Sequence, residues 1–264
     1  MSTPQSSPTR RALIWALPVV IILVAIALIA LSLTGKSKPR ANEPAPTSTT
    51  VTQQPAQPEA QLQEPEEVTV DEYVEVLMQN RGPDLSRRIA DEPGSFGEVE
   101  APVTMVVYSD YQCKFCSLWT QQTMTVLMSE YVDQGKLRIE LRDVNVFGEP
   151  SRQAALAAHA AEKQGQFWQM HQAMFPDGAT LPADQLTAEA LTGVAGQLGM
   201  DTDQFAADMS SEEVVESVTQ NEAEGQSIGV SSTPSFLING IPMTGAQPAN
   251  VFTAIIDAEL ALVQ

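Results

Sequence analysis

An α/β fold is the architecture that this sequence predicts, with a block of helices inserted between the first strands and the last ones. Two strand-like runs, Val103–Tyr108 and Leu137–Val144, flank a helical stretch and form a βαβ unit with it. The intervening helix lets the two strands pair in parallel. A right-handed crossover then places the turn after the first strand at the carboxyl end of the sheet, where α/β folds carry their functional sites.

An apolar segment precedes this fold. The run from Ala12 to Gly35, residues 12–35, contains no charged residue. As a helix it is long enough to cross a bilayer core of about 30 Å. We predict a transmembrane helix there, after a short cytoplasmic N-terminus of residues 1–11. A cleaved signal peptide is the alternative, because Ala30-Leu-Ser32 is an acceptable cleavage site, although the apolar region of such a peptide is shorter, about 7–15 residues.

Residues 36–67 are rich in Pro, Thr, Gln and Glu and have almost no large apolar side chains, which predicts a disordered linker. All 33 acidic residues of the chain lie beyond position 42, together with only nine of its 14 lysines and arginines. This negative charge excludes nucleic acid as a partner. It is typical of the solvated surface of an exported domain.

Residues 68–264 contain the predicted folded domain, with a helical insertion over about 148–226. Leu137–Val144 alternates apolar and charged residues, which predicts a half-buried strand. Thr233–Gly240 predicts a strand that ends in an Asn-Gly turn. The predicted helices cover Val70–Asn80, the cysteine motif to about Gln134, Ser151 to Met209 with interruptions, Glu212 to about Ile228, and Pro248–Val263.

The only two cysteines, Cys113 and Cys116, directly follow the first strand in Tyr111-Gln-Cys-Lys-Phe-Cys-Ser117. The spacing places Cys113 at the first turn of the next helix, where unpaired backbone N–H groups and the helix dipole favour a thiolate. Cys116 lies one turn further and faces its partner. We interpret the two residues as a redox pair.

Two other interpretations of the cysteines stay open. A structural disulfide across four residues would stabilise the fold by only about 2 kcal/mol, because the closed loop is so short. A zinc site needs four ligands, and His159 and His171 do not stand at ligand-like spacing from the cysteines. We therefore predict no metal and no other cofactor, and a soft-metal site remains an alternative.

Four segments in a fixed order resemble DsbA-like thiol-disulfide oxidoreductases, a branch of the thioredoxin-fold proteins. The resemblance covers most of residues 96–260 and implies a thioredoxin-like fold with an inserted helical subdomain, here preceded by one transmembrane helix and a disordered linker. The segments are Ala101–Cys116, Gln164–His171 with Phe175, Leu198–Asp201 with Phe205, and Ile228–Gly240.

The resemblance implies roles for individual residues. It makes Cys113 the exposed nucleophile and Cys116 its buried partner. It also implies a cis peptide bond between Thr233 and Pro234, which form the second wall of the site and present the backbone of Thr233 to an extended client strand.

Two departures from the family pattern affect this assignment. Lys114 and Phe115 stand between the cysteines where the type member has Pro-His, so these two positions are expected to tune the thiolate. The resemblance also implies a buried acid six residues before the first cysteine, where this chain has Val107. Asp110 or water is the expected alternative carrier of protons near Cys116.

The implied function is that of an extracytoplasmic oxidase that introduces disulfides into reduced exported proteins and is reoxidised by a membrane-embedded partner. A cysteine pair that works as an oxidant belongs outside the cytosol, where thiols are not kept reduced. The catalytic domain is therefore expected outside a single-pass membrane anchor. The alternatives are an exported reductase or isomerase, and a non-enzymatic thiol-based metal carrier or chaperone module.

Overall fold

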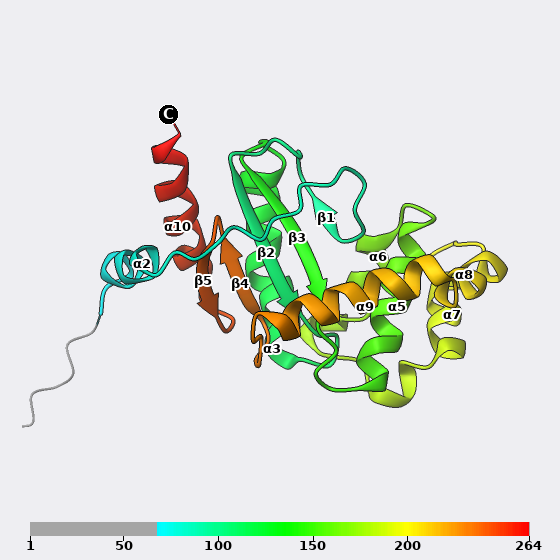
Figure 1. Cartoon of the computed structure of the whole chain (residues 1–264). Helices are drawn as coiled ribbons and strands as arrows, with labels where there is room; N and C mark the ends of the chain where they lie inside the picture. Colours follow the sequence, from blue (N-terminus) through cyan, green and yellow to red (C-terminus); the bar gives the residue numbers. More distant parts are fainter. Residues whose placement is uncertain (1–67, 264) are drawn as a thin grey trace, which may run out of the picture. The chain divides into compact units, whose positions relative to one another are not determined.

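The computed structural model describes residues 68–263, which fold around one five-stranded mixed sheet in the order β1-β3-β2-β4-β5 (Figure 1). β2 and β3 are parallel, and the other three strand pairs are antiparallel. The predicted parallel βαβ unit is therefore confirmed. The strands are β1 (Ser95–Phe96), β2 (Val103–Ser109), β3 (Leu137–Asp143), β4 (Ser235–Ile238) and β5 (Ile241–Thr244).

The helices follow the predicted order, and the helical block between β3 and β4 is built from five α-helices and two short 3₁₀ turns. The helix after the cysteines contains two π-type turns. The helical elements are α2 (Val70–Gln79), α3 (Lys114–Trp119), η2 (Thr120–Met124), α4 (Thr125–Leu127), η3 (Met128–Val132), α5 (Glu149–Glu162), α6 (Phe167–Ala173), η4 (Pro176–Gly178), η5 (Ala183–Gln185), α7 (Ala188–Gln197), α8 (Thr202–Met209), α9 (Glu212–Ser227) and α10 (Ala249–Leu262).

Two local predictions have different outcomes. The Asn239-Gly240 turn between β4 and β5 is confirmed, and both residues have the positive φ angles that such a two-residue hairpin turn requires. The sequence did not predict β1, because Pro93–Gly97 has the composition of a turn. Ser95 and Phe96 nevertheless pair with Glu140 and Ile139 of β3.

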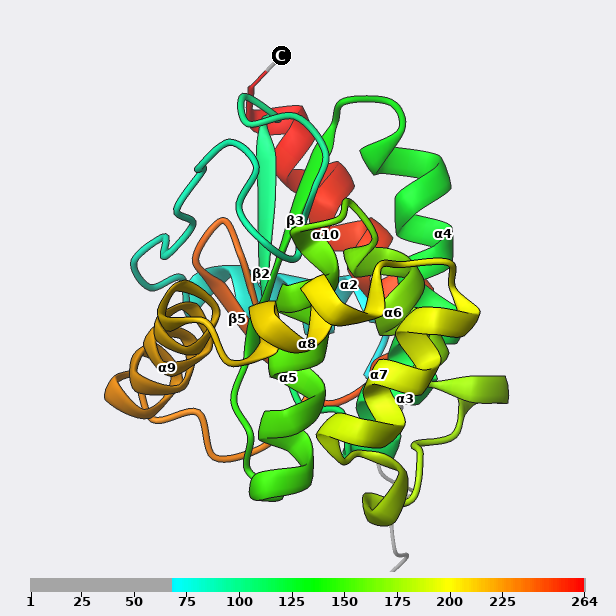
Figure 2. The same cartoon turned by 90° about the vertical axis from the view of Figure 1, so that its right-hand side faces the viewer.

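The two faces of the sheet are covered by different elements. Alternate residues of β2 and β3, including Val107 and Leu141, pack into the main hydrophobic core with Cys116 and with Phe252 of α10. In Figure 2, α9 lies on one side of the sheet, and α3, α4 and α10 lie on the other. The redox motif therefore belongs to the apolar face, and α9 covers the opposite face.

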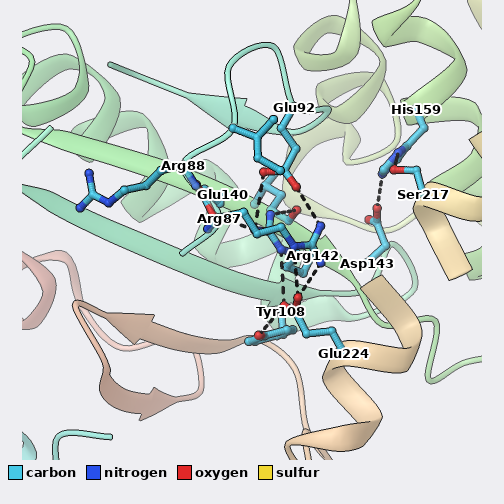
Figure 3. Close-up of polar contacts among 12 residues, drawn as sticks. Arg87, Arg88, Glu92, Tyr108, Glu140, Arg142, Asp143, His159, Ser217 and Glu224 are labelled. Carbon is cyan, nitrogen blue, oxygen red and sulfur yellow. Dashed lines mark hydrogen bonds and ion pairs between the residues drawn. The ribbon is translucent and has the colours of Figure 1, made fainter. Parts of the chain in front are cut away.

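That opposite face carries charge, and the prediction of a half-buried β3 is wrong because all seven residues of the strand are buried. Glu140 is 0% exposed and accepts hydrogen bonds from the guanidinium groups of Arg138 (2.8 Å) and Arg142 (2.7 Å). The backbone N–H groups of Arg87 and Arg88 also donate to its carboxylate, each at 2.9 Å (Figure 3). Buried charges need such partners. The alternating pattern therefore marks a buried ion network.

Residues 81–92, here called the N-terminal arm, lie over this charged face. At one end of the arm, the Arg81 guanidinium pairs with Glu259 of α10 and donates to the carbonyl of Asn239 at 2.8 Å. At the other end, Glu92 pairs with Arg87, whose guanidinium also donates to Glu224 of α9. The arm thus connects the sheet to α9 and to the C-terminal helix.

Among residues 68–263, no helix has both the length and the apolar character needed to cross a membrane. The predicted transmembrane segment, residues 12–35, and the predicted linker, residues 36–67, lie outside the described part of the chain.

Candidate active site

The cysteine motif lies where β2 ends, at the start of the helix that packs on the sheet. Cys113 is the N-cap of α3, and its sulfur accepts a hydrogen bond from the backbone N–H of Cys116 at 3.3 Å. Sequence reasoning placed Cys113 one residue further, inside the first turn. The N-cap position has the same electrostatic consequence, because the free N–H groups of the helix start point at the sulfur.

The two thiols have very different acidities. The Cys116 thiol lowers the pKa of Cys113 to about 6 by hydrogen bonding and outweighs the opposing effect of burial. The Thr233 side chain and the backbone N–H groups of Cys116 and Phe115 lower the pKa of Cys113 further. Burial raises the pKa of Cys116 well above its usual value, although a hydrogen bond from Ser109 opposes it. The pair therefore holds one thiolate and one thiol near neutral pH.

The structure brings Thr233 and Pro234 next to this pair. Their peptide bond is cis, as the resemblance implied. The sulfur of Cys113 lies 3.2 Å from the carbonyl oxygen of Thr233, across 120 residues of sequence. Cys113, Cys116 and the Thr233-Pro234 turn thus form one site at the carboxyl end of β2.

Each of the three residues before Cys113 is anchored to a different segment. The carboxylate of Asp110 accepts from the hydroxyl of Ser151 at 2.6 Å and from the backbone N–H of Phe147 at 3.1 Å. The Gln112 side chain donates to the carbonyl of Leu181 at 2.6 Å. Tyr111 bonds to His171, as described below. Asp110 also accepts from the backbone of Gln112, so its oxygens fix the turn.

His171 connects the helical insertion to the redox motif. Its Nδ1 lies 3.0 Å from the hydroxyl of Tyr111, and its Nε2 lies 3.4 Å from the hydroxyl of Thr120, which follows α3. Burial lowers the pKa of His171 to about 4, against a smaller opposing effect of Asp143. The ring is therefore neutral near pH 7, and its role is to position the segments on both sides of the cysteines. No pattern in the sequence indicates which groups His171 contacts.

One expectation about the cysteines is wrong. Cys113 was expected to be the exposed nucleophile, but only 3% of its surface is exposed, and Cys116 is fully buried. The wall formed by Thr233 covers the Cys113 sulfur. Lys114 and Phe115 are both exposed, Phe115 by 59%. Phe115 contributes to the acidity of Cys113 through its backbone N–H group.

A second polar chain lies behind the motif, and sequence reasoning did not find it. Nε2 of His159 lies 2.8 Å from the Asp143 carboxylate, and its Nδ1 lies 3.1 Å from the hydroxyl of Ser217 (Figure 3). These residues come from β3, α5 and α9, and their spacing in the sequence gives no indication that they meet.

Comparisons with known proteins agree with this geometry. The thioredoxin family model matches residues 91–258. The chain is 29% identical over 150 residues to a probable disulfide bond formation protein D of Bacillus anthracis. This alignment covers 55% of this chain and 69% of that protein. The chain is also 30% identical over 162 residues to a Na(+)/H(+) antiporter NhaA of Herminiimonas arsenicoxydans, of which it covers only 25%.

Solved structures share the fold. Oxidised BdbD from Bacillus subtilis superimposes with a TM-score of 0.59 at 22% identity, covering 69% of this chain and 97% of that one. A thioredoxin-like oxidoreductase from Silicibacter pomeroyi superimposes with a TM-score of 0.56 at 25% identity, covering 66% and 94%. The chain therefore belongs to the thioredoxin family, and within that family it is a DsbA-like protein disulfide oxidoreductase.

Proposed function

We propose that this oxidoreductase works as an extracytoplasmic oxidase that introduces disulfides into reduced exported proteins. The observation that carries the proposal is the difference between the two thiols, with the pKa of Cys113 lowered to about 6 and that of Cys116 raised. An interaction that stabilises the Cys113 thiolate stabilises the reduced enzyme. It therefore makes the disulfide a stronger oxidant.

The proposed cycle begins with an oxidised Cys113–Cys116 pair. A client thiolate attacks the sulfur of Cys113, a client–Cys113 bond forms, and the enzyme disulfide breaks. Cys116 leaves with the electron pair and takes up a proton. A second client thiolate then attacks the client sulfur and releases Cys113 as a thiolate, so that the client has lost two electrons and the enzyme has gained them. The low pKa of Cys113 makes it a good leaving group in this last step.

The backbone at Thr233 is the proposed contact for the client. Its carbonyl oxygen lies 3.2 Å from the Cys113 sulfur, so a strand that pairs with this backbone brings its own cysteine to the same sulfur. Because Cys113 is almost fully covered, the client strand has to displace the contact between its sulfur and the carbonyl of Thr233. Lys114 and Phe115 are exposed beside this contact and are proposed to tune the reaction.

Location and reoxidation complete the proposal. The apolar run of residues 12–35 would anchor the chain, with residues 1–11 in the cytoplasm and the catalytic domain outside. There the cytosolic reducing systems do not reach the pair. The relatives named disulfide bond formation protein D support an oxidative role. A membrane-embedded partner would accept the two electrons and restore the disulfide.

The test is the redox equilibrium of the full chain in glutathione buffers, combined with refolding of a reduced client protein. An oxidase should have a potential closer to about −120 mV than to about −270 mV, the values of a strong oxidant and of cytosolic thioredoxin. It should also restore client activity in stoichiometric amounts when added in its oxidised form. A potential at the thioredoxin end without client oxidation would instead favour the exported reductase.

A further inference from the structure

Cys116 is a buried thiol that has to exchange its proton with solvent during the reaction. Cys116 is 0% exposed and carries a thiol proton whenever the pair is reduced. To form the disulfide again, this thiol has to lose its proton, and the proton has to return when a client reduces the pair. A fully buried sulfur therefore needs a neighbouring group that carries the proton to and from solvent.

The strand register places one acid close to this sulfur. Ser109, whose side chain lowers the pKa of Cys116 against the effect of burial, stands opposite Asp143 in the parallel β2–β3 pair. Side chains alternate along a strand, and the odd-numbered residues of both strands, such as Val107 and Leu141, face the core that contains Cys116. Ser109 and Asp143 therefore project from the same face of neighbouring strands, which are about 4.8 Å apart.

Two further observations place the Asp143 carboxylate beside the redox motif. It is only 3% exposed, and its negative charge raises the pKa of Tyr111, two residues before Cys113, adding to the larger effect of burial. The same charge acts on His171, which bonds to Tyr111. The carboxylate oxygen that bonds to His159 is Oδ2.

A hydrogen-bonded chain leads from Asp143 to the surface. Its Oδ2 lies 2.8 Å from Nε2 of His159, and Nδ1 of His159 lies 3.1 Å from the hydroxyl of Ser217 (Figure 3). His159 and Ser217 both line an open pocket of about 430 Å³. These hydrogen bonds thus connect a buried carboxylate to an open pocket lined by residues of α5 and α9.

We propose that Asp143, His159 and Ser217 form the route by which the proton of Cys116 reaches solvent, with the Ser109 hydroxyl as the contact to the sulfur. In this proposal Ser109 is the residue that meets the reacting sulfur, whereas the other three residues act through it. The proposal concerns the oxidoreductase reaction itself. It holds for either direction of electron flow, so it does not depend on the oxidase proposal.

A serine, a histidine and an aspartate in a row also resemble a hydrolase triad, but the surroundings of Ser217 do not fit that chemistry. Ser217 lies in the middle of α9, where backbone N–H groups are bonded within the helix. They are not available to stabilise an oxyanion. A proton route needs only the hydrogen-bonded chain and access to water, and both are present.

Closure of the disulfide moves one proton from Cys116 to Asp143 and one electron pair to the leaving thiol. Cys113 starts in a mixed disulfide with the sulfur of an oxidant, for which oxidised glutathione serves in the test. The Cys116 thiol gives its proton to Ser109, which passes its own proton to Asp143. The Cys116 sulfur then forms a bond to Cys113, the bond from Cys113 to glutathione breaks, and glutathione leaves as a thiolate with the electron pair.

The charges around the route affect its pH dependence. At the pocket, His159 is surrounded by four acids and one base from the N-terminal arm, α5 and α9, and at the inner end Asp143 faces Tyr111 and His171. The outer end of the route therefore lies in an acidic surrounding, which all the variants tested below retain. The pocket groups are Asp91, Glu162, Lys163, Glu213 and Glu216.

The test uses the full chain, reduced and then mixed with oxidised glutathione between about pH 5 and pH 9, with acid quench and mass spectrometry to follow the Cys113–glutathione adduct. Formation of the adduct reports on Cys113, and its disappearance reports on Cys116.

Asp143→Asn keeps the size of the side chain and an acceptor for His159 but cannot take up the proton. Asp257→Asn is the matched control, because it removes the charge of a carboxylate that accepts from Tyr131 at 3.0 Å, far along the chain in α10.

We expect Asp143→Asn to slow disappearance of the adduct about 10²-fold near pH 7, the lower end of the range of about 10²–10⁴ for general acid–base catalysis, and to make the rate rise about tenfold per pH unit. Adduct formation should stay within about twofold of the parent, which also reports that the variant is folded. Ser109→Ala should slow the same step. Equal rates and pH profiles for the parent and Asp143→Asn, or equal slowing by Asp257→Asn, would overturn the proposal. Failure of the parent itself to form the adduct would count against the redox activity instead.

Discussion

Glu140 is the residue on which the charged face of the sheet depends. The structure gives it four donors, two guanidinium groups and two backbone N–H groups, at 2.7 to 2.9 Å. Burial raises the pKa of its carboxyl, but the hydrogen bonds from Arg138 and Arg87 and the charge of Arg142 outweigh this effect and lower it. Its carboxylate is therefore charged in the folded protein at neutral pH, and it compensates the buried Arg138 and Arg142.

Glu140→Gln removes this charge without a large change in volume. Removing one partner of a buried ion pair typically costs about 3–5 kcal/mol, because the other charge stays buried without compensation. For a domain of this size, each kcal/mol lowers the Tm by about 2–4 °C, so we expect a decrease of about 6–20 °C.

The assay is thermal and urea unfolding of the full chain at pH 7, with Glu100→Gln as the control at an exposed carboxylate. The control should stay within about 0.5 kcal/mol of the parent. Because the folded pKa of Glu140 is lowered, its contribution is present above the unfolded pKa of about 4.3 and is lost as the pH falls through the folded value. The variant should therefore lose less stability than the parent on acidification. A decrease in Tm equal to that of the control would refute the assigned role of the network.

Three further predictions concern the redox site. The ultraviolet absorbance of the thiolate should titrate with a midpoint near pH 6 in the reduced protein, and Cys116→Ala should raise that midpoint because the hydrogen bond from the Cys116 thiol is lost. The same variant should accumulate mixed disulfides between Cys113 and client proteins, detectable on non-reducing gels, and their absence would contradict the assigned roles of the two cysteines. Because burial lowers the pKa of His171 to about 4, the unfolded chain takes up its proton first as the pH falls below about 6.5. Between about pH 6.5 and pH 4, this group should lower the free energy of unfolding of the parent by about 3 kcal/mol. In urea unfolding, His171→Gln should lack that part of the pH dependence.

The sequence predicted those features that depend on local pattern. The βαβ unit, the Asn239-Gly240 turn and the helix start at the cysteines each follow from periodicity or from a few adjacent residues. The contact between Cys113 and Thr233 was predicted only from the family resemblance. The two residues are 120 positions apart, so no local pattern connects them. Periodicity and spacing place Cys113 in the site, but they do not place Thr233 there.

Features that depend on tertiary contacts were missed or misread. The alternation in Leu137–Val144 indicates which side chains share a face. It does not indicate whether the charged side chains on one face are solvated by water or paired with other charged groups of the protein. Here the N-terminal arm and α9 supply the partners, so the charged residues are buried. The exposure of Cys113 was misjudged for a similar reason, since the backbone of Thr233 covers its sulfur. The chain from Asp143 through His159 to Ser217 joins three elements and has no signature in the sequence.

The contacts of the N-terminal arm have a consequence for how the protein is made. Arg81 lies 158 residues from Asn239 and 178 residues from Glu259, and it bonds to both. The arm leaves the ribosome first, but it cannot complete these contacts until the C-terminal helix has been synthesised. During that interval Arg81 lacks its partner Glu259, and the nascent domain cannot reach its final stability. Contacts between the first and the last segments of the described domain thus make completion of the fold a post-translational event.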